Sequence, residues 1–346
     1  MTKSASLAAA VLALLPTAVL ADAESDGLAE VKAFTLEHTA RLEADTAALQ
    51  NAVDAYAAIL AAHQGDYAAA LAAEGPALAE AIKAIRAAWL VASNDYETIE
   101  GIVAGVPSTA LFDLILDAGN PGTEAEDVAD YDLVLPDGTV LHQPGSLFHS
   151  LSEPLFWGTD PAHLIVAGDV DGDGAASPGE GLFDVNLAQG VATGLVKWSG
   201  ELDVAMMAWE PNRNDAFAAV VTMTPTVGDY FGEWKESQFI NGKIGAFVAQ
   251  SRLVDVSGIM GGCKRMYFSA VSPVVAAGDP EMDATIRAAF DELLALVEET
   301  RTREAAGTAF GAEEADALGS EAQDMADRIV AMVLQAAARH DVKLEG

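Results

Sequence analysis

Three aspartates alternate with small residues in the stretch DVDGDGAASPGE, residues 169–180. This stretch fits the calcium-loop pattern D-x-D-x-D-G-x5-E in full. Carboxylates supply the hard oxygen ligands that Ca²⁺ prefers, and the glycine at the sixth position permits the sharp turn that such a loop needs. The sequence therefore predicts a calcium site formed by the carboxylates of Asp169, Asp171, Asp173 and Glu180, the carbonyl of Ala175 and the hydroxyl of Ser177.

The residues at the end of this loop favour a structural calcium site over a calcium sensor. Ala176 stands at the eighth position, where an EF-hand usually carries a larger aliphatic residue. Pro178 and Gly179 oppose a helix directly after the loop. We therefore expect an isolated loop that holds an irregular segment in place and is not the main functional site. The alternative is an ordinary solvated turn on an acidic surface.

A histidine and a glutamate four residues apart form a second candidate site, in the segment GSLFHSLSEPLFWGTD, residues 145–160. If the segment is helical, this spacing places His149 and Glu153 on one face. Such a pair can bind a transition metal or transfer protons. A second interpretation is that Ser150 and Glu153 have the spacing of a capping box, with Pro154 in the first helical turn. The helix would then begin after His149.

The same segment resembles the imelysin-like family, whose signature is glycine–x–histidine–x–x–glutamate followed by an apolar stretch and Trp-Gly. Glu153, Trp157 and Gly158 align with this signature. Counted back from Trp157, Ser150 occupies the position of the family histidine, and His149 stands one residue early. The signature is therefore shifted in this chain.

Other segments resemble the family in the same order along the chain. The opening helix, the first-bundle helix and the later helix with its glycine-rich continuation all have counterparts here. Ser93 stands where the first-bundle helix of the family has an arginine. The resemblance extends over nearly the whole chain after residue 23, through residues 34–56, 86–100, 251–253 and 258–267.

The resemblance implies a fold of two helical bundles, with the histidine–glutamate motif near their junction and Glu100 close to Glu153. It also implies a periplasmic protein of iron or other cation acquisition, which hands its cargo to a membrane transport partner. On this interpretation a cleft between the bundles binds iron or another transition metal through Glu100, Glu153 and His149.

Two other functions stay open from the sequence. The family was first named for an insulin-cleaving protease, so a metal-dependent hydrolase at the same cleft is one alternative. The chain has no HExxH motif, and no conventional serine or cysteine nucleophile stands out, so the sequence favours a binding protein over an enzyme. The third function is an interaction protein whose family site has decayed, as the serines at positions 93 and 150 suggest.

Apolar residues at helical spacing predict the elements that position these residues. Between residues 101 and 147 the pattern is irregular, and Pro136-Asp137-Gly138 predicts a tight turn within a small hairpin. Because every clearly periodic segment is helical, the predicted fold class is all-α, with two bundles and a long irregular excursion. The predicted helices lie within residues 28–62, 76–100 with Pro76 in the first turn, 187–209, 279–297 with Asp279-Pro280 at the start, and 318–336. The apolar, glycine-punctuated residues 243–275 predict a further helix or a broken pair of helices.

Composition and charge limit the classes of partner. The chain has 346 residues and a net charge of −35, from 53 acidic and 18 basic residues. Such a surface repels nucleic acids and anionic membranes and attracts cations. We therefore predict metal ions as partners and no nucleic acid.

The first 23 residues predict a secretory signal peptide. Lys3 precedes an apolar run over residues 7–20, and Ala21-Asp22-Ala23 provides a small-x-small cleavage site. We therefore expect a periplasmic or secreted protein without a membrane span after cleavage. The expected domains are residues 1–23 as signal peptide, 24–185 as N-terminal bundle with the excursion and the calcium loop, and 186–346 as C-terminal bundle.

Overall fold

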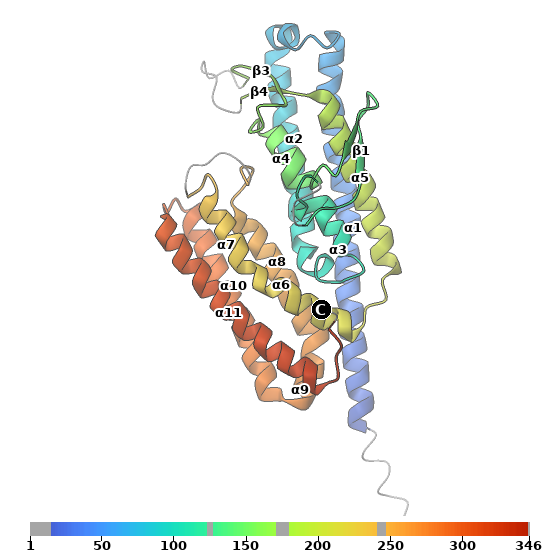
Figure 1. Cartoon of the computed structure of the whole chain (residues 1–346), viewed down its shortest axis with the longest axis vertical. Coiled ribbons are helices and arrows are strands. Elements are labelled where there is room, and N and C mark those ends of the chain that lie inside the picture. The colour runs from blue at the N-terminus through green and yellow to red at the C-terminus, as the bar shows by residue number, and fades with distance from the viewer. Residues whose placement is uncertain (1–14, 123–126, 171–179, 241–246, 345–346) are drawn as a thin grey trace, which may run out of the picture.

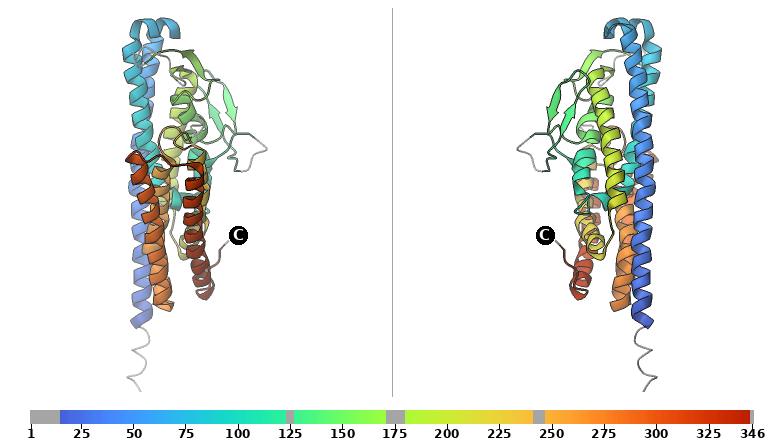
Figure 2. Two further views of the ribbon diagram at one scale, coloured as in Figure 1. Left: turned by 90° about the vertical axis from the view of Figure 1, so that its left-hand side faces the viewer. Right: turned by 90° about the vertical axis from the view of Figure 1, so that its right-hand side faces the viewer.

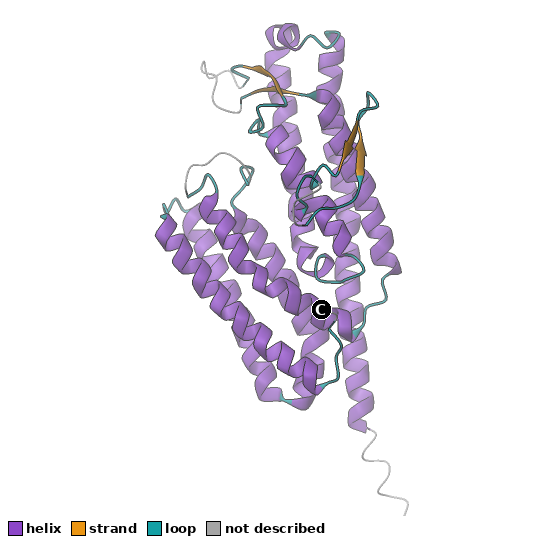
Figure 3. Cartoon of the chain, viewed as in Figure 1, coloured by secondary structure: helices purple, strands orange, loops and turns teal. Residues whose placement is uncertain are grey.

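The computed structural model describes residues 15–122, 127–170, 180–240 and 247–344 (Figure 1). It is 74% helical and 4% strand, which confirms the predicted all-α fold. Helices dominate the ribbon, and the strands form short hairpins beside it (Figure 3). The helices form two bundles that are tilted against each other (Figure 1).

The first bundle contains the two longest helices and one later helix. α1 (Leu15–Ala62) and α2 (Tyr67–Val103) form a helical hairpin, and α5 (Val185–Ala208) packs along α1. α2 begins nine residues before the predicted start at Pro76, because the Asp66 side chain accepts a hydrogen bond from the Ala69 amide and caps the helix there. Proline inside a helix clashes with the preceding turn, and a kink at Glu74 accommodates it.

The irregular excursion lies between α2 and α5. β1 (Asp132–Val134) and β2 (Val140–His142) form the hairpin predicted around Pro136-Asp137-Gly138, and Gly138 has the positive φ that its turn requires. A second antiparallel pair, β3 with β4, follows further along. The excursion also contains α3 (Ala110–Asp113), a π-helical turn at Leu114–Ala118, another at Leu147–Ser152, α4 (Glu153–Phe156), β3 (Leu164–Ala167) and β4 (Gly181–Phe183).

The second bundle is built from the helices after α5. Among them, α8 contacts both α2 of the first bundle and α7 and α10 of its own bundle. The bundle comprises α6 (Arg213–Met223), a 3₁₀ turn at Thr224–Thr226, α7 (Val227–Glu236), α8 (Arg252–Met266), a π-helical turn at Tyr267–Val271, α9 (Ser272–Gly278), α10 (Pro280–Ala305) and α11 (Ala312–Arg339).

α1 is long enough to contact both bundles (Figure 2). Towards its N-terminal end it packs against the π-helical turn Tyr267–Val271 and α9, where Gly27 lies so close to the Ser269 carbonyl that a Cβ atom would overlap it. Because α5 packs on α1, the divide between the bundles falls after α5 in the structure. The predicted boundary at residue 185 lies before that helix.

Glycines bring α2 and α8 into close contact at the junction of the bundles. A Cβ atom on Gly101 would lie 2.5 Å from the Ile259 carbonyl oxygen, and one on Gly258 would lie 3.0 Å from the Glu97 carbonyl oxygen. Cys263 is buried in the same contact, as its apolar sequence setting indicates. The crossing holds the acidic residues of α2 against Asp255 of α8.

Within the described residues, no helix combines the length and apolarity that a membrane crossing requires. Residues 1–14 of the predicted signal peptide lie outside the described residues.

Candidate metal centre

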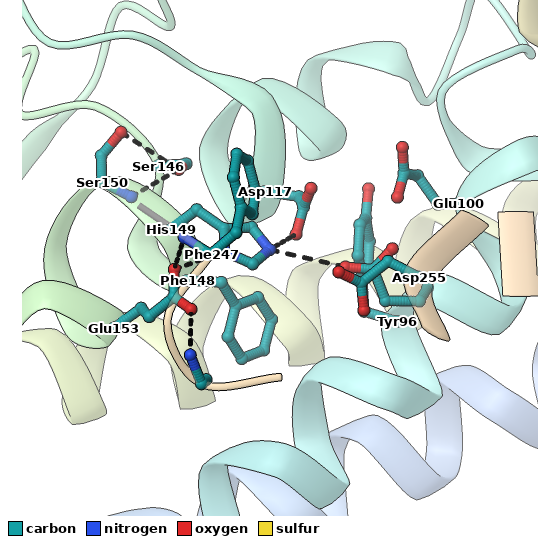
Figure 4. A network of polar contacts seen from close by, with 12 residues as sticks. Tyr96, Glu100, Asp117, Ser146, Phe148, His149, Ser150, Glu153, Phe247 and Asp255 are labelled. Carbon is teal, nitrogen blue, oxygen red and sulfur yellow. Dashed lines mark hydrogen bonds and ion pairs between the residues drawn. The ribbon is translucent and has the colours of Figure 1, made fainter. Parts of the chain in front are cut away.

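Six carboxylates are buried together where the two bundles meet. Figure 4 labels four of them, Glu100, Asp117, Glu153 and Asp255. Each of these side chains belongs to a residue at most 8% exposed, although charged residues are rarely buried without partners. They are Glu97 and Glu100 of α2, Asp113 of α3, Asp117 of the π-helical turn after α3, Glu153 of α4 and Asp255 of α8.

A π-helical turn positions His149 in this cluster. The turn spans Leu147–Ser152 and is capped by Ser146, whose side chain accepts a hydrogen bond from the Ser150 amide. His149 therefore lies inside a helix, and the interpretation of Ser150 and Glu153 as a capping box is wrong. The Ser150 hydroxyl instead donates to the Gly119 carbonyl at 2.9 Å.

The two ring nitrogens of His149 face different carboxylates (Figure 4). Nδ1 lies 3.0 Å from Glu153 Oε2, whereas Nε2 lies 3.2 Å from Asp117 Oδ1 and 3.5 Å from Glu97 Oε1. Burial alone would lower the pKa of His149, but Asp117 and Glu153 outweigh it and raise that pKa well above its ordinary value. Among the described residues, His149 is therefore the positive charge closest to Asp117 and Glu153.

Glu153 receives hydrogen bonds from three consecutive backbone amides of the second bundle. Oε1 accepts from Val248 at 2.8 Å and from Ala249 at 2.9 Å, and Oε2 accepts from Phe247 at 3.0 Å. Burial would raise the pKa of Glu153, but His149 and these amides hold it below its ordinary value. Glu153 is thus an ionised carboxylate with partners on both oxygens.

Glu97, Glu100 and Asp117 have fewer partners, although Glu100 Oε1 accepts a hydrogen bond from the Tyr230 hydroxyl at 2.6 Å. Oε1 and Oε2 of Glu97, Oε2 of Glu100 and Oδ1 of Asp117 are buried and make no hydrogen bond within the described part of the chain. Nε2 of His149 is also buried and makes no hydrogen bond within the described residues. Its contacts with Asp117 and Glu97 are ion-pair contacts without hydrogen-bond geometry. Ligand atoms of these three carboxylates lie within 4.8 Å of one another, and so do those of Glu97, His149 and Asp255. Either group could hold a metal ion.

Arg252 supplies the second positive charge of the cluster. Its guanidinium is within 2.8 Å of Glu233, 3.0 Å of Asp255 and 3.6 Å of Glu97. It also stacks on the rings of Tyr230 and Phe247, at 4.7 and 4.4 Å from their centroids. One buried arginine and one imidazolium thus face six carboxylates, and the cluster keeps an excess of acidic groups.

Asp113 should make the cation-free protein less stable as the pH rises. Burial, with Asp117 nearby, raises the pKa of Asp113 to about 8. Between an unfolded value of about 4 and this value, the folded state holds a proton that the unfolded state releases, so the free energy of unfolding falls with increasing pH. We expect Asp113→Asn to flatten this fall. Thermal unfolding in a chelator from pH 5 to pH 9 measures it, with the exposed Asp324→Asn as control. Equal slopes for wild type and Asp113→Asn would contradict the assignment.

The structure brings three of the predicted site residues together, namely His149, Glu153 and Glu100, which belong to one network of buried groups (Figure 4). The described ends of the predicted calcium loop lie between β3 and β4. There Glu180 Oε1 accepts a hydrogen bond from the Val170 amide at 2.6 Å. The other predicted ligands, Asp171, Asp173, Ala175 and Ser177, lie outside the described residues.

Sequence reasoning missed most of the cluster. Glu97 follows the buried aromatic residues Trp89 and Tyr96 on the same helix as the predicted Glu100, and an acidic residue within such an apolar stretch is the signal that could have identified it. Asp113 and Asp117 similarly interrupt the apolar run LFDLILD. Asp255 gave no comparable signal.

One comparison with known proteins gives a match. The family model described as Peptidase_M75, Imelysin, matches residues 35–331, which is most of the chain. No curated protein matches the sequence. The matched range includes every residue of the buried cluster.

Proposed function

The chain belongs to the imelysin family, and from this membership we propose that it is a periplasmic protein that binds a metal cation in the buried cluster during uptake of iron or another cation. The observation that carries the proposal is the set of buried polar atoms without hydrogen bonds, four carboxylate oxygens and one imidazole nitrogen. Burying such groups without hydrogen bonds is costly, and a cation would satisfy them together.

The residues fit a metal ion in type and in position. Glu97, Glu100, Asp117 and His149 carry the atoms without hydrogen bonds, and Asp255 lies within reach of Glu97 and His149. Carboxylates and imidazole are ligands of first-row transition metals such as iron and zinc. The cation is the cargo on this proposal, and the excess of carboxylates over positive groups provides the attraction.

Burial of the cluster favours binding over hydrolysis. A metal-dependent hydrolase needs an open coordination position and an activated water that a substrate can reach. The candidate ligand side chains are at most 9% exposed. The peptidase label in the family name therefore gains no support from the geometry of the described residues, and we propose binding without catalysis.

We further propose that residues 169–180 bind a structural calcium ion. The full loop pattern supports this proposal, as does the antiparallel pairing of Ala167 with Gly181, which closes the two ends of the loop on each other. The proposed periplasmic location and the membrane transport partner rest on the leader-like residues 1–23 and on the family. The charge of −35 suits a protein that collects cations.

The two proposed sites should lose their metals independently. We expect His149→Ala to lose iron or zinc binding and to keep calcium, because it removes an imidazole ligand only from the cluster. We expect Asp171→Ala to do the reverse. Calorimetry and elemental analysis of the wild type and both variants, with calcium, zinc and anaerobic ferrous iron titrated separately, measure this.

Each outcome separates the candidate functions. If calcium alone binds, the buried cluster is not a cation site, and an interaction protein with a decayed site becomes the better interpretation. If both variants lose both metals, the two sites are not independent.

A further inference from the structure

Glu153 ties a short segment of the second bundle to the cluster. We name residues 247–250, which precede α8, the strap. The amides of Phe247, Val248 and Ala249 all point at the Glu153 carboxylate, at 2.8 to 3.0 Å. The Gln250 side chain adds hydrogen bonds to Asn94 of α2 and Asp255 of α8. The strap is thereby held on both sides of the bundle junction.

The backbone of the strap is strained where it meets Glu153. Phe247 has a φ of 53°, a left-handed conformation that residues other than glycine rarely adopt. Its ring packs 4.9 Å from the His149 ring and 4.4 Å from the Arg252 guanidinium, so the strap also covers the cluster. Successive amides in such a conformation form a concave site for an anion. In this protein the anion is Glu153.

The Glu153 carboxylate also orients the His149 ring through its contact with Nδ1. Four donors already occupy its two oxygens, three backbone amides and Nδ1 of His149. A histidine that gives its Nδ1 proton to a carboxylate is fixed in the tautomer whose Nε2 is free to bind a metal. Nε2 of His149 faces Asp117 and Glu97 and makes no hydrogen bond within the described residues.

We propose that Glu153 is a positioning residue, which holds the strap on the cluster and His149 in its metal-binding orientation, and that it is not itself a metal ligand. The inference rests on the proposed cation site and revises the assignment of Glu153 as a ligand. Nε2 of His149, Glu97, Glu100 and Asp117 would then contact the cation.

Cobalt(II) and zinc(II) are suitable probes, because the visible spectrum of bound Co²⁺ reports its ligands and bound Zn²⁺ permits nitrogen NMR of His149. We expect Glu153→Ala and Glu153→Gln to bind Co²⁺ about 10–100-fold more weakly than the wild type. Their spectra at saturation should equal that of the wild type, because no ligand is lost. Glu100→Gln, which removes a proposed ligand, should change the spectrum.

In the zinc-loaded wild type, the His149 ring should carry its proton on Nδ1 and bind the metal through Nε2. In cation-free Glu153→Gln, an amide N–H that donates to Nδ1 would favour the opposite tautomer, which cation binding has to reverse, so this variant binds more weakly while its saturated site keeps the same ligands. An altered cobalt spectrum in Glu153→Ala at saturation, or zinc on Nδ1 in the wild type, would overturn the inference and leave the proposed function standing. Absence of Co²⁺ and Zn²⁺ binding by the wild type would overturn both. If the Glu153 variants do not fold, the wild-type NMR measurement decides alone.

Discussion

Replacing Glu97 with glutamine should weaken cation binding about 100-fold or more, which corresponds to about 2.7 kcal/mol. Glu97 is the residue that both candidate ligand groups share, and both of its oxygens are buried without a hydrogen bond in the described chain. Glutamine keeps the shape of the side chain and removes its charge, so the loss reports the contribution of the carboxylate.

The same substitution should stabilise the cation-free protein. Burial, with Asp255 and Asp117 nearby, raises the pKa of Glu97 well above its ordinary value, so its ionised form is disfavoured in the folded state. We expect the free energy of unfolding in a chelator to rise by about 1–3 kcal/mol near pH 8, the typical cost of an unsatisfied buried group. Calorimetric titration and urea unfolding measure the two effects.

Glu292→Gln is the matched control, because Glu292 is exposed on α10 and lies away from the cluster. It should change neither cation affinity nor stability. Unchanged cation affinity in Glu97→Gln would contradict the proposed site, whatever happens to stability.

Replacing Gly101 with alanine should destabilise the protein by about 1–3 kcal/mol, the usual cost of overpacking a close contact. The new methyl group would lie 2.5 Å from the Ile259 carbonyl oxygen and 2.9 Å from Cys263 Sγ. A backbone carbonyl cannot move aside unless α8 moves with it. Because α8 carries Asp255 and α2 carries Glu97, we also expect weaker cation binding.

Gly261→Ala is the matched control on α8, where a Cβ atom would meet nothing within 4 Å. Alanine favours a helix over glycine by about 1 kcal/mol, so this variant should gain stability. Urea unfolding of both variants provides the test. If Gly101→Ala is as stable as Gly261→Ala, the two helices are not in the close contact described here.

The long helices and the first hairpin could be predicted from the sequence because their signals are local. Apolar spacing indicates a helical face, and Pro136-Asp137-Gly138 indicates a turn. The sequence predicts a start of α2 at Pro76, because proline is typical of a first helical turn. The actual start is nine residues earlier, because the Asp66 side chain caps the helix and a kink at Glu74 accommodates the proline.

Most of the metal centre could not be predicted, because burial of a carboxylate depends on packing between distant segments. Asp117 and Asp255 are 138 positions apart in the chain and meet only where α8 crosses the first bundle. The sequence also does not determine whether His149 reaches the cluster, because an α-helix and a π-helical turn place the same residue on different faces. The π-helical turn at Leu147–Ser152 places His149 in the cluster.

The shared helix α1 has a consequence for the cooperativity of folding. Neither bundle has a complete core without α1, since α2 and α5 pack on one part of it and the turn Tyr267–Val271 with α9 on another. Detaching one bundle would therefore expose apolar surface on the other. We therefore expect the two bundles to unfold as one cooperative unit, so that the acidic groups at their junction separate only when the whole chain unfolds.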